Sequence, residues 1–130
     1  MPGLVLALDQ AAGAVCDGVA FRVQAGAEAE TLAALREREL ISSAYLEDWL
    51  DVALADGSRV LALAYVIDPA HEQYCGGLPL EDQAQIIARA TGGRGPNRDY
   101  LYSTAEHLAA LGIADTDLDW LAVRVRQLSA

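Results

Sequence analysis

The pair Asp56 and Gly57 constrains the fold most, because it separates two segments that have the composition of β-strands. Asp followed by Gly is a strong signal for a two-residue hairpin turn, which requires positive φ angles. Residues 45–54 contain aromatic and branched side chains, and residues 60–67 form a nearly continuous apolar run. The pattern predicts an antiparallel hairpin with residues 60–67 as a central strand covered on both faces. Residues 45–54 also fit a helical period, so a helix remains an alternative there.

A second hairpin is predicted near the N-terminus. Residues 4–8 form a short apolar run, residues 9–17 have the composition of a turn, and residues 18–23 alternate as a strand does. We expect the two apolar segments to pair with each other.

Helical periodicity predicts four helices, over residues 27–39, 80–91, 97–111 and 116–128. The first is rich in Ala, Leu, Glu and Arg and contains no Gly or Pro. The other three carry apolar side chains at helical spacing, and these are expected to face inward: Ile86, Ile87, Ala90, Leu101, Leu108, Leu111, Leu118, Leu121, Ala122, Val125 and Leu128.

The ends of these helices carry capping signals. Asn97 is the expected N-cap of the third helix, and Asp115 or Thr116 that of the fourth. The glycines at 92–93 and at 112 are expected to end the second and third helices as C-caps.

Length and charge narrow the class of protein. The chain has 130 residues, which predicts one domain over residues 1–130. Nine Arg and no Lys stand against nineteen acidic residues, so the net charge is −10. This charge repels a phosphate backbone and argues against nucleic acid and anionic membranes as partners. Because the charge disfavours these partners, a small-molecule partner is expected. No apolar run approaches the ~18 residues of a membrane span.

No cofactor or metal is expected from the residue pattern. Cys16 and Cys75 lack a CxxC spacing, and His71 and His107 complete no zinc pattern, so free thiols are predicted. Residues 93–97 lack the Gly-Lys-Ser/Thr ending of a phosphate loop. The first residues contain no basic segment followed by an apolar one, which predicts a cytoplasmic location.

Glu39 is the candidate acid/base. On the first predicted helix it lies in line with Leu32 and Leu35, whereas Glu37 faces away. Burial on an apolar stripe would raise a carboxyl pKa from about 4.3 towards the ~6 to 7 that suits proton transfer at neutral pH. The alternative is a solvated helix end, or a pair with Arg36 one turn back.

Four blocks in this order resemble the ChaC-like, glutathione-specific γ-glutamylcyclotransferase family. The blocks are residues 2–8 (Pro-Gly-Leu-Val-Leu-Ala-Leu), residues 18–23 (Gly-Val-Ala-Phe-Arg-Val), Arg38-Glu39 followed by Tyr45, and residues 95–101 (Gly-Pro-Asn-Arg-Asp-Tyr-Leu). The resemblance covers essentially the whole chain.

The resemblance implies an α+β fold with a small, mainly antiparallel, barrel-like sheet and helices packed around it. Family members begin with a strand and a Tyr-Gly-Ser-Leu loop that binds the γ-glutamyl group. The present chain is expected to start downstream of that loop, with the N-terminal strand missing, and to correspond to the C-terminal two-thirds of the catalytic domain.

The implied reaction splits glutathione, or another γ-glutamyl compound, into 5-oxoproline and cysteinylglycine without a metal or cofactor. The family's catalytic glutamate falls on Glu39. Tyr45 and Tyr100 align with family tyrosines near the substrate, with Tyr74 as a further candidate; the alternative for the tyrosines is core packing with a satisfied hydroxyl. The alternative function is an impaired, truncated relative that binds a γ-glutamyl ligand or a protein, including a second copy, through an open sheet edge.

Overall fold

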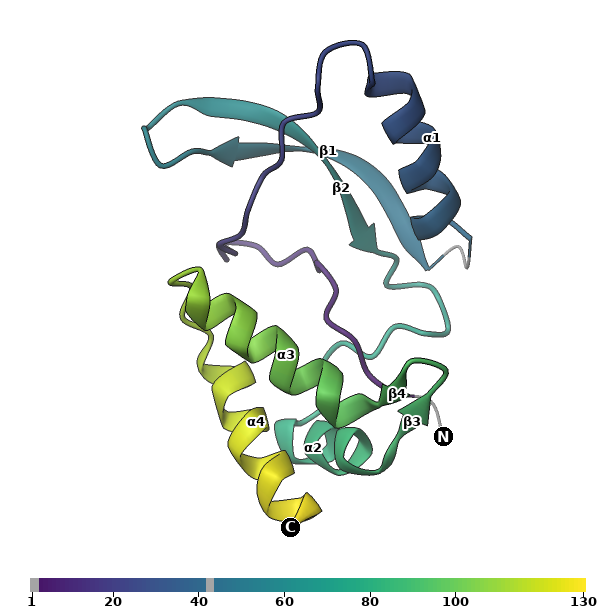
Figure 1. The fold of residues 1–130 in the computed structure, drawn as a ribbon, viewed down its shortest axis with the longest axis vertical. Helices are drawn as coiled ribbons and strands as arrows, with labels where there is room; N and C mark the ends of the chain where they lie inside the picture. The colour runs from purple at the N-terminus through teal and green to yellow at the C-terminus, as the bar shows by residue number, and fades with distance from the viewer. Residues whose placement is uncertain (1–2, 42–43) are drawn as a thin grey trace. The chain divides into compact units, whose positions relative to one another are not determined.

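The computed structural model describes residues 3–41 and 44–130, which fall into two compact units (Figure 1). One unit is Ala7–Gly76, and the other joins the N-terminal segment through Leu6 to Gly77–Ala130. The architecture is α+β, as predicted. In the described part of the chain the strands form two separate two-stranded antiparallel sheets and no closed barrel. No described helix is both long enough and apolar enough to cross a membrane.

The hairpin predicted around Asp56 and Gly57 is confirmed. Strand β1 (Tyr45–Ala53) pairs antiparallel with β2 (Arg59–Ile67), which excludes the helical alternative for residues 45–54. In the unit Ala7–Gly76, helix α1 (Glu28–Glu39) lies beside this hairpin (Figure 1).

The turn of the hairpin is one residue longer than predicted. The N–H of Leu54 donates to the carbonyl of Ser58 at 2.8 Å, and the N–H of Gly57 donates to the carbonyl of Leu54 at 3.0 Å. Three residues therefore form the loop, with Gly57 in the left-handed region at φ 88°. This is the three-residue hairpin that combines a turn with a left-handed residue. The longer loop shifts the register and pairs Glu47 with Tyr65.

The prediction that residues 60–67 form a central strand was wrong. Of this strand only Ile67 is buried, and Leu61 is 69% exposed. A central strand pairs with a neighbour along each of its two edges, yet among the described residues β2 has a ladder with β1 alone. Its other edge meets one residue, Leu8, whose carbonyl accepts the N–H of Ile67 at 2.8 Å.

The predicted N-terminal hairpin was also wrong, since neither residues 4–8 nor residues 18–23 form a strand in the described chain. The backbone of residues 4–8 bonds elsewhere: the N–H of Leu6, for example, donates to the Tyr100 hydroxyl at 3.1 Å. In residues 18–23, Phe21 is 89% exposed and finds no sheet face to pack on. An apolar run becomes a strand only where a partner strand takes up its backbone groups.

Three helices build the core of the second unit: α2 (Leu80–Arg89), α3 (Asn97–Ala110) and α4 (Thr116–Ser129). Asp115 caps α4, as predicted, by accepting the N–H of Leu118 at 3.0 Å. Leu111 lies beyond the end of α3 and is exposed, against prediction. The core cluster consists of side chains predicted to face inward together with Ala84: Ala84, Ile87, Leu101, Leu118, Leu121 and Val125.

Glycine ends only one of the two helices for which a glycine C-cap was predicted. Gly112 follows α3 at φ 76°, and the N–H of Ile113 donates to the carbonyl of Leu108 at 2.9 Å, as expected of a glycine C-cap. Helix α2 instead ends in an extended residue, Ala90, and its glycines belong to a short hairpin of β3 (Thr91–Gly92) and β4 (Gly95–Pro96). The C-cap prediction for residues 92–93 was therefore wrong.

Asn97 has a different role from the predicted N-cap. Pro96 occupies the N-cap position, and Asn97 is the first residue of α3, only 8% exposed. The N–H of Leu4 donates to Oδ1 of Asn97 at 2.8 Å, and Nδ2 of Asn97 donates to the carbonyl of Leu4 at 2.9 Å. An amide side chain carries one acceptor and a donor group, so Asn97 pairs with Leu4 as a neighbouring strand would.

Replacing Asn97 by Ala should lower the free energy of unfolding by about 1–3 kcal/mol, because both backbone groups of Leu4 lose their partner in a half-buried position. Urea denaturation followed by circular dichroism measures this change. Ser103→Ala, at an exposed position of the same helix, is the control and should leave stability nearly unchanged. Equal stability of Asn97→Ala and Ser103→Ala would contradict the assignment.

Helices α2 and α4 are joined by an ion pair that predicts an acid-sensitive contribution to stability. Nε and Nη2 of Arg124 donate to the carboxylate of Glu81 at 2.9 and 2.8 Å. These bonds, together with a weaker effect of the hydrogen bond from Gln85, lower the pKa of Glu81 from 4.5 to about 2. A depressed carboxyl pKa stabilises the fold above the unfolded pKa, and the contribution is lost as pH falls from 4.5 towards 2.

The difference in Tm between the wild type and Arg124→Gln should therefore be present near neutral pH and shrink as pH falls through this window. The effect is modest, because both side chains are partly exposed. Arg94→Gln removes the same charge from an exposed position of the same unit and is the control. A pH-independent difference would contradict the role of the Glu81 carboxylate.

Candidate functional site

Glu39 is the last residue of α1 and lies on the predicted face of the helix. Its side chain is 29% exposed, and Leu32 and Leu35 on the same face are also half-buried, whereas Glu37 is exposed. The predicted depth was wrong, however, since no residue of α1 is fully buried. Glu39 therefore sits at the edge of an apolar stripe and keeps contact with solvent.

The partner of Glu39 also differs from the alternative considered above. Oε1 of Glu39 accepts a hydrogen bond from Nε of the adjacent Arg38 at 3.0 Å. Arg36, one turn back, is engaged by Glu47 on strand β1. Each of the two carboxylates thus has its own arginine as counter-charge.

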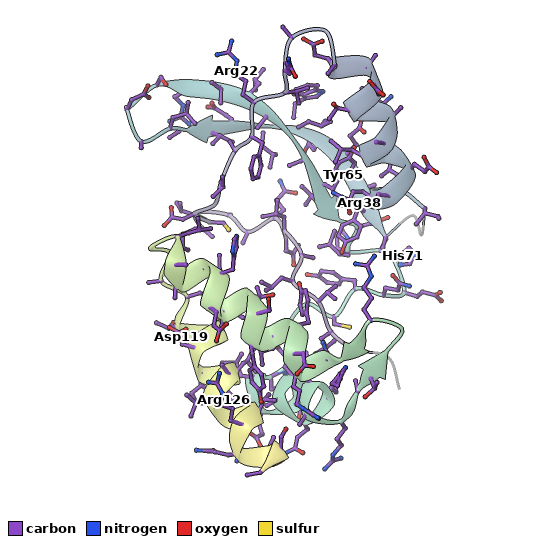
Figure 2. The ribbon with its side chains drawn as sticks, in the orientation of Figure 1. Arg22, Arg38, Tyr65, His71, Asp119 and Arg126 are labelled. Carbon is purple, nitrogen blue, oxygen red and sulfur yellow. The ribbon has the colours of Figure 1, made fainter. Side chains whose placement is uncertain are left out.

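Glu47 binds side chains from two other elements. Nε and Nη2 of Arg36, on α1, donate to the two carboxylate oxygens at 2.9 and 2.8 Å. The hydroxyl of Tyr65, on β2, donates to Oε2 of Glu47 at 3.0 Å. We refer to Arg36, Glu47 and Tyr65 as the Glu47 cluster. Figure 2 shows Tyr65 on β2 and Arg38 in the last turn of α1, near this cluster.

The electrostatics of the cluster fix its protonation. The hydrogen bond from Arg36 lowers the pKa of Glu47, against the opposing effect of partial burial. Burial raises the pKa of Tyr65, and the hydrogen bond to Glu47 and the charge of Glu39 raise it further. At neutral pH Tyr65 is therefore a protonated donor and Glu47 a charged acceptor. Tyr65 lies directly opposite Glu47 in the ladder, so its side chain is on the face of the hairpin next to α1.

A cleft of about 540 Å³ lies elsewhere in the same unit. Leu46 and Asp48 contribute to it from β1, whereas Glu47, the residue between them, points to α1. Because successive side chains of a strand point to opposite faces, the cleft and α1 lie on opposite faces of the hairpin. The lining residues are Asp9, Gln10, Ala11, Ala12, Leu46, Asp48, Val66, Ile67, Pro69 and Tyr74.

The three candidate tyrosines fall in different places. Tyr45 is half-buried on β1, two residues before Glu47, so it lies on the face of the hairpin next to α1. Tyr74 lines the cleft, and its hydroxyl donates to Oδ2 of Asp9 at 2.6 Å. Tyr100 belongs to the other unit and accepts the N–H of Leu6. Of the three candidates, Tyr45 alone shares the α1 face of the hairpin with Glu47 and Tyr65.

Glu47 and Tyr65 were not among the residues singled out from sequence. A two-residue loop would have paired Glu47 with Val66, because shifting a register by one residue changes which side chains share a face. Only the three-residue loop brings Tyr65 opposite Glu47. The sequence signal that could have found this cluster was Glu47 within the predicted strand, combined with Gly57 as the left-handed residue of a three-residue loop.

The remaining candidates for chemistry are the cysteines. Cys16 and Cys75 are free thiols, as predicted, and both are exposed. Within residues 3–41 and 44–130, His, Cys, Asp and Glu side chains do not form a group of three that could hold a metal ion.

Comparison with known proteins identifies the family. The model of the ChaC-like protein family matches residues 1–128, so the chain belongs to this family. It is 36% identical to the glutathione-specific γ-glutamylcyclotransferase of Escherichia coli, over 99% of this chain and 55% of that protein. It is 33% identical to γ-glutamylcyclotransferase 2-3 of Arabidopsis thaliana, over 98% of this chain and 67% of that protein.

A relative in Danio rerio, named glutathione-specific γ-glutamylcyclotransferase 1, is 33% identical over 83% of this chain and 56% of its own length. The chain thus spans between 55% and 67% of these three relatives. The similarity extends across both structural units, because the family match reaches from the N-terminal segment into α4.

The contact between Tyr74 and Asp9 yields a prediction about the cleft. The hydrogen bond to Asp9 is the largest of the effects that raise the pKa of Tyr74. Asp9→Ala should therefore lower this pKa towards the usual value near 10. NMR titration of carbon-13-labelled tyrosine measures it, with the exposed Asp17→Ala as control. An unchanged Tyr74 pKa would show that the contact is not made in solution.

Proposed function

We propose that this chain acts as a γ-glutamylcyclotransferase that splits glutathione, or another γ-glutamyl compound, with Glu39 as general acid/base. The observation that carries the proposal is the half-buried carboxylate of Glu39, which belongs to the Arg38-Glu39 block of the sequence resemblance and lies within the range that the family model matches. The names of the three relatives support the same reaction, and the names of the Escherichia coli and Danio rerio relatives also support glutathione as the substrate.

The proposed reaction is an intramolecular transfer. The α-amine of the γ-glutamyl group attacks its own side-chain carbonyl carbon, and a new C–N bond closes the five-membered ring of 5-oxoproline. The bond between that carbon and the amide nitrogen then breaks, and glutathione yields cysteinylglycine. The proton lost by the attacking amine replaces the bond lost by the leaving nitrogen, so the equation balances without water, metal or nucleotide.

Glu39 can carry this proton. A carboxylate accepts the proton from the attacking amine, and the resulting carboxylic acid donates it to the leaving nitrogen. A group that keeps contact with solvent at the edge of an apolar stripe can reach a substrate and still change its protonation state. Ring closure depends mainly on holding the amine against the carbonyl, so binding groups contribute as much as the base.

The tyrosines are proposed as substrate-binding groups. Tyr45 has structural support, because it shares the α1 face of the hairpin with the Glu47 cluster and Glu39. For Tyr74 and Tyr100 the support is the family resemblance alone, since Tyr74 lies on the opposite face and Tyr100 belongs to the other unit. A phenol hydroxyl would donate to a substrate carboxylate or carbonyl.

The proposal also covers the setting of the protein. We infer a cytoplasmic location from the exposed free thiols, which persist in reducing compartments. We also propose that residues 1–130 form one domain, matching the C-terminal two-thirds of the family's catalytic domain, and that β1 and β2 belong to its barrel-like sheet. The net charge of −10 supports a small-molecule substrate over nucleic acid or an anionic membrane.

A non-catalytic interaction domain is the second candidate. It is supported by the β1–β2 sheet, which carries large, exposed apolar side chains, among them Trp49 and Leu61. Such a surface could bind a protein or a second copy of the chain. Turnover of glutathione distinguishes it from the enzyme.

Glu39→Gln should reduce the release of 5-oxoproline from glutathione by about 10² to 10⁴-fold, because an amide cannot exchange protons as a carboxylate does. Glu37→Gln, two residues earlier on the exposed face of α1, is the matched control and should retain wild-type activity. Full activity of Glu39→Gln would exclude Glu39 as the acid/base. Glutathione binding in calorimetry without turnover by the wild type would instead indicate a non-catalytic domain that binds a γ-glutamyl ligand, whereas no binding together with concentration-dependent dimerisation would support the interaction domain.

A further inference from the structure

We propose that Glu47 is a positioning residue for Glu39, because it fastens the last turns of α1 to the β1–β2 hairpin through Arg36 and Tyr65. This inference rests on the proposed function, since it concerns the same acid/base. Glu47 need not touch the substrate. Its contribution is to hold the carboxylate of Glu39 at one place relative to the sheet.

The geometry of Glu47 suits such an anchor. Its carboxylate joins three elements, since it lies on β1, accepts two hydrogen bonds from Arg36 on α1 and accepts one from Tyr65 on β2. A fork of two parallel bonds between a guanidinium and a carboxylate fixes orientation as well as distance. Glu47 is also better shielded than the carboxylates of the Arg38–Glu39, Arg59–Asp51 and Arg124–Glu81 ion pairs, at 21% exposure.

Arg36 connects Glu47 to the helical turn that contains Glu39. Its guanidinium is held by Glu47, and its carbonyl accepts the N–H of Leu40 at 3.0 Å, which closes the helical turn that contains Glu39. Arg36 and Glu39 are three residues apart, so they lie on neighbouring positions of the helix surface. Movement of Arg36 away from β1 would carry the turn, and Glu39 with it.

Helix α1 depends on this anchor because its other attachments are weak. None of its twelve residues is fully buried, and no side chain caps its N-terminus. Isolated helices of this length are marginal in water, so contacts to the rest of the protein decide whether the last turn stays formed. A misplacement of a catalytic group by about 1 Å can cost 10²-fold in rate.

The test compares steady-state kinetics of three variants. Glu47→Gln keeps the size of the side chain but loses the ion pair, and it should lower kcat about tenfold or more with KM nearly unchanged. Tyr65→Phe removes one of three bonds to Glu47 and should lower kcat less. Asp51→Asn is the matched control, because it breaks the Asp51–Arg59 ion pair of the same hairpin and should leave kcat unchanged.

A double-variant cycle separates positioning from general stability. If Glu47 acts through Glu39, Glu47→Gln should cause no further loss of kcat in the Glu39→Gln background. Independent, multiplying losses would overturn the proposal. So would an equal loss of kcat in Glu47→Gln and Asp51→Asn, measured below the Tm of both.

Hydrogen exchange tests the inference even if the wild type shows no turnover, an outcome that would remove the proposed function. The amide of Leu40 should exchange faster in Glu47→Gln than in the wild type, while Asp51→Asn leaves its rate unchanged. Unchanged exchange of Leu40 in Glu47→Gln would show that Glu47 does not hold the last turn, and would overturn the anchor itself.

Discussion

The left-handed conformation of Gly57 sets the pairing on which the candidate site depends. It lengthens the hairpin loop to three residues, and the register of β1 and β2 follows from that length. The register places Tyr65 opposite Glu47, so that one carboxylate can accept bonds from both the sheet and α1. Since a one-residue slip would exchange the two faces of the strand, a single backbone conformation decides which residues surround Glu39.

Local patterns predicted the elements of this fold well. Helical spacing predicted the core of α2, α3 and α4, and the turn residues predicted the hairpin, because both signals depend on neighbours in sequence. The predicted orientation of Glu39 was confirmed for the same reason. What local patterns could not supply was the depth of burial of α1, since that depends on which distant segments cover it.

Predictions failed where a partner lay far along the chain. Residues 4–8 have the composition of a strand, yet Leu4 pairs with the amide side chain of Asn97, 93 positions away. The same long-range contact explains why Asn97 is not an N-cap. The Glu47 cluster was missed through a loop length that the Asp-Gly pair alone did not specify, since glycine occurs in both two- and three-residue hairpin turns.

The cations of this chain are all arginines, and the ion pairs of Glu39, Glu47, Asp51 and Glu81 all use them. A guanidinium stays charged at any physiological pH and is a poor nucleophile, whereas a lysine amine can lose its proton and attack carbonyl carbons. In the proposed cyclisation the attacking group is the substrate's own amine. The chain therefore offers no side-chain amine that could compete with it and become acylated by the γ-glutamyl group.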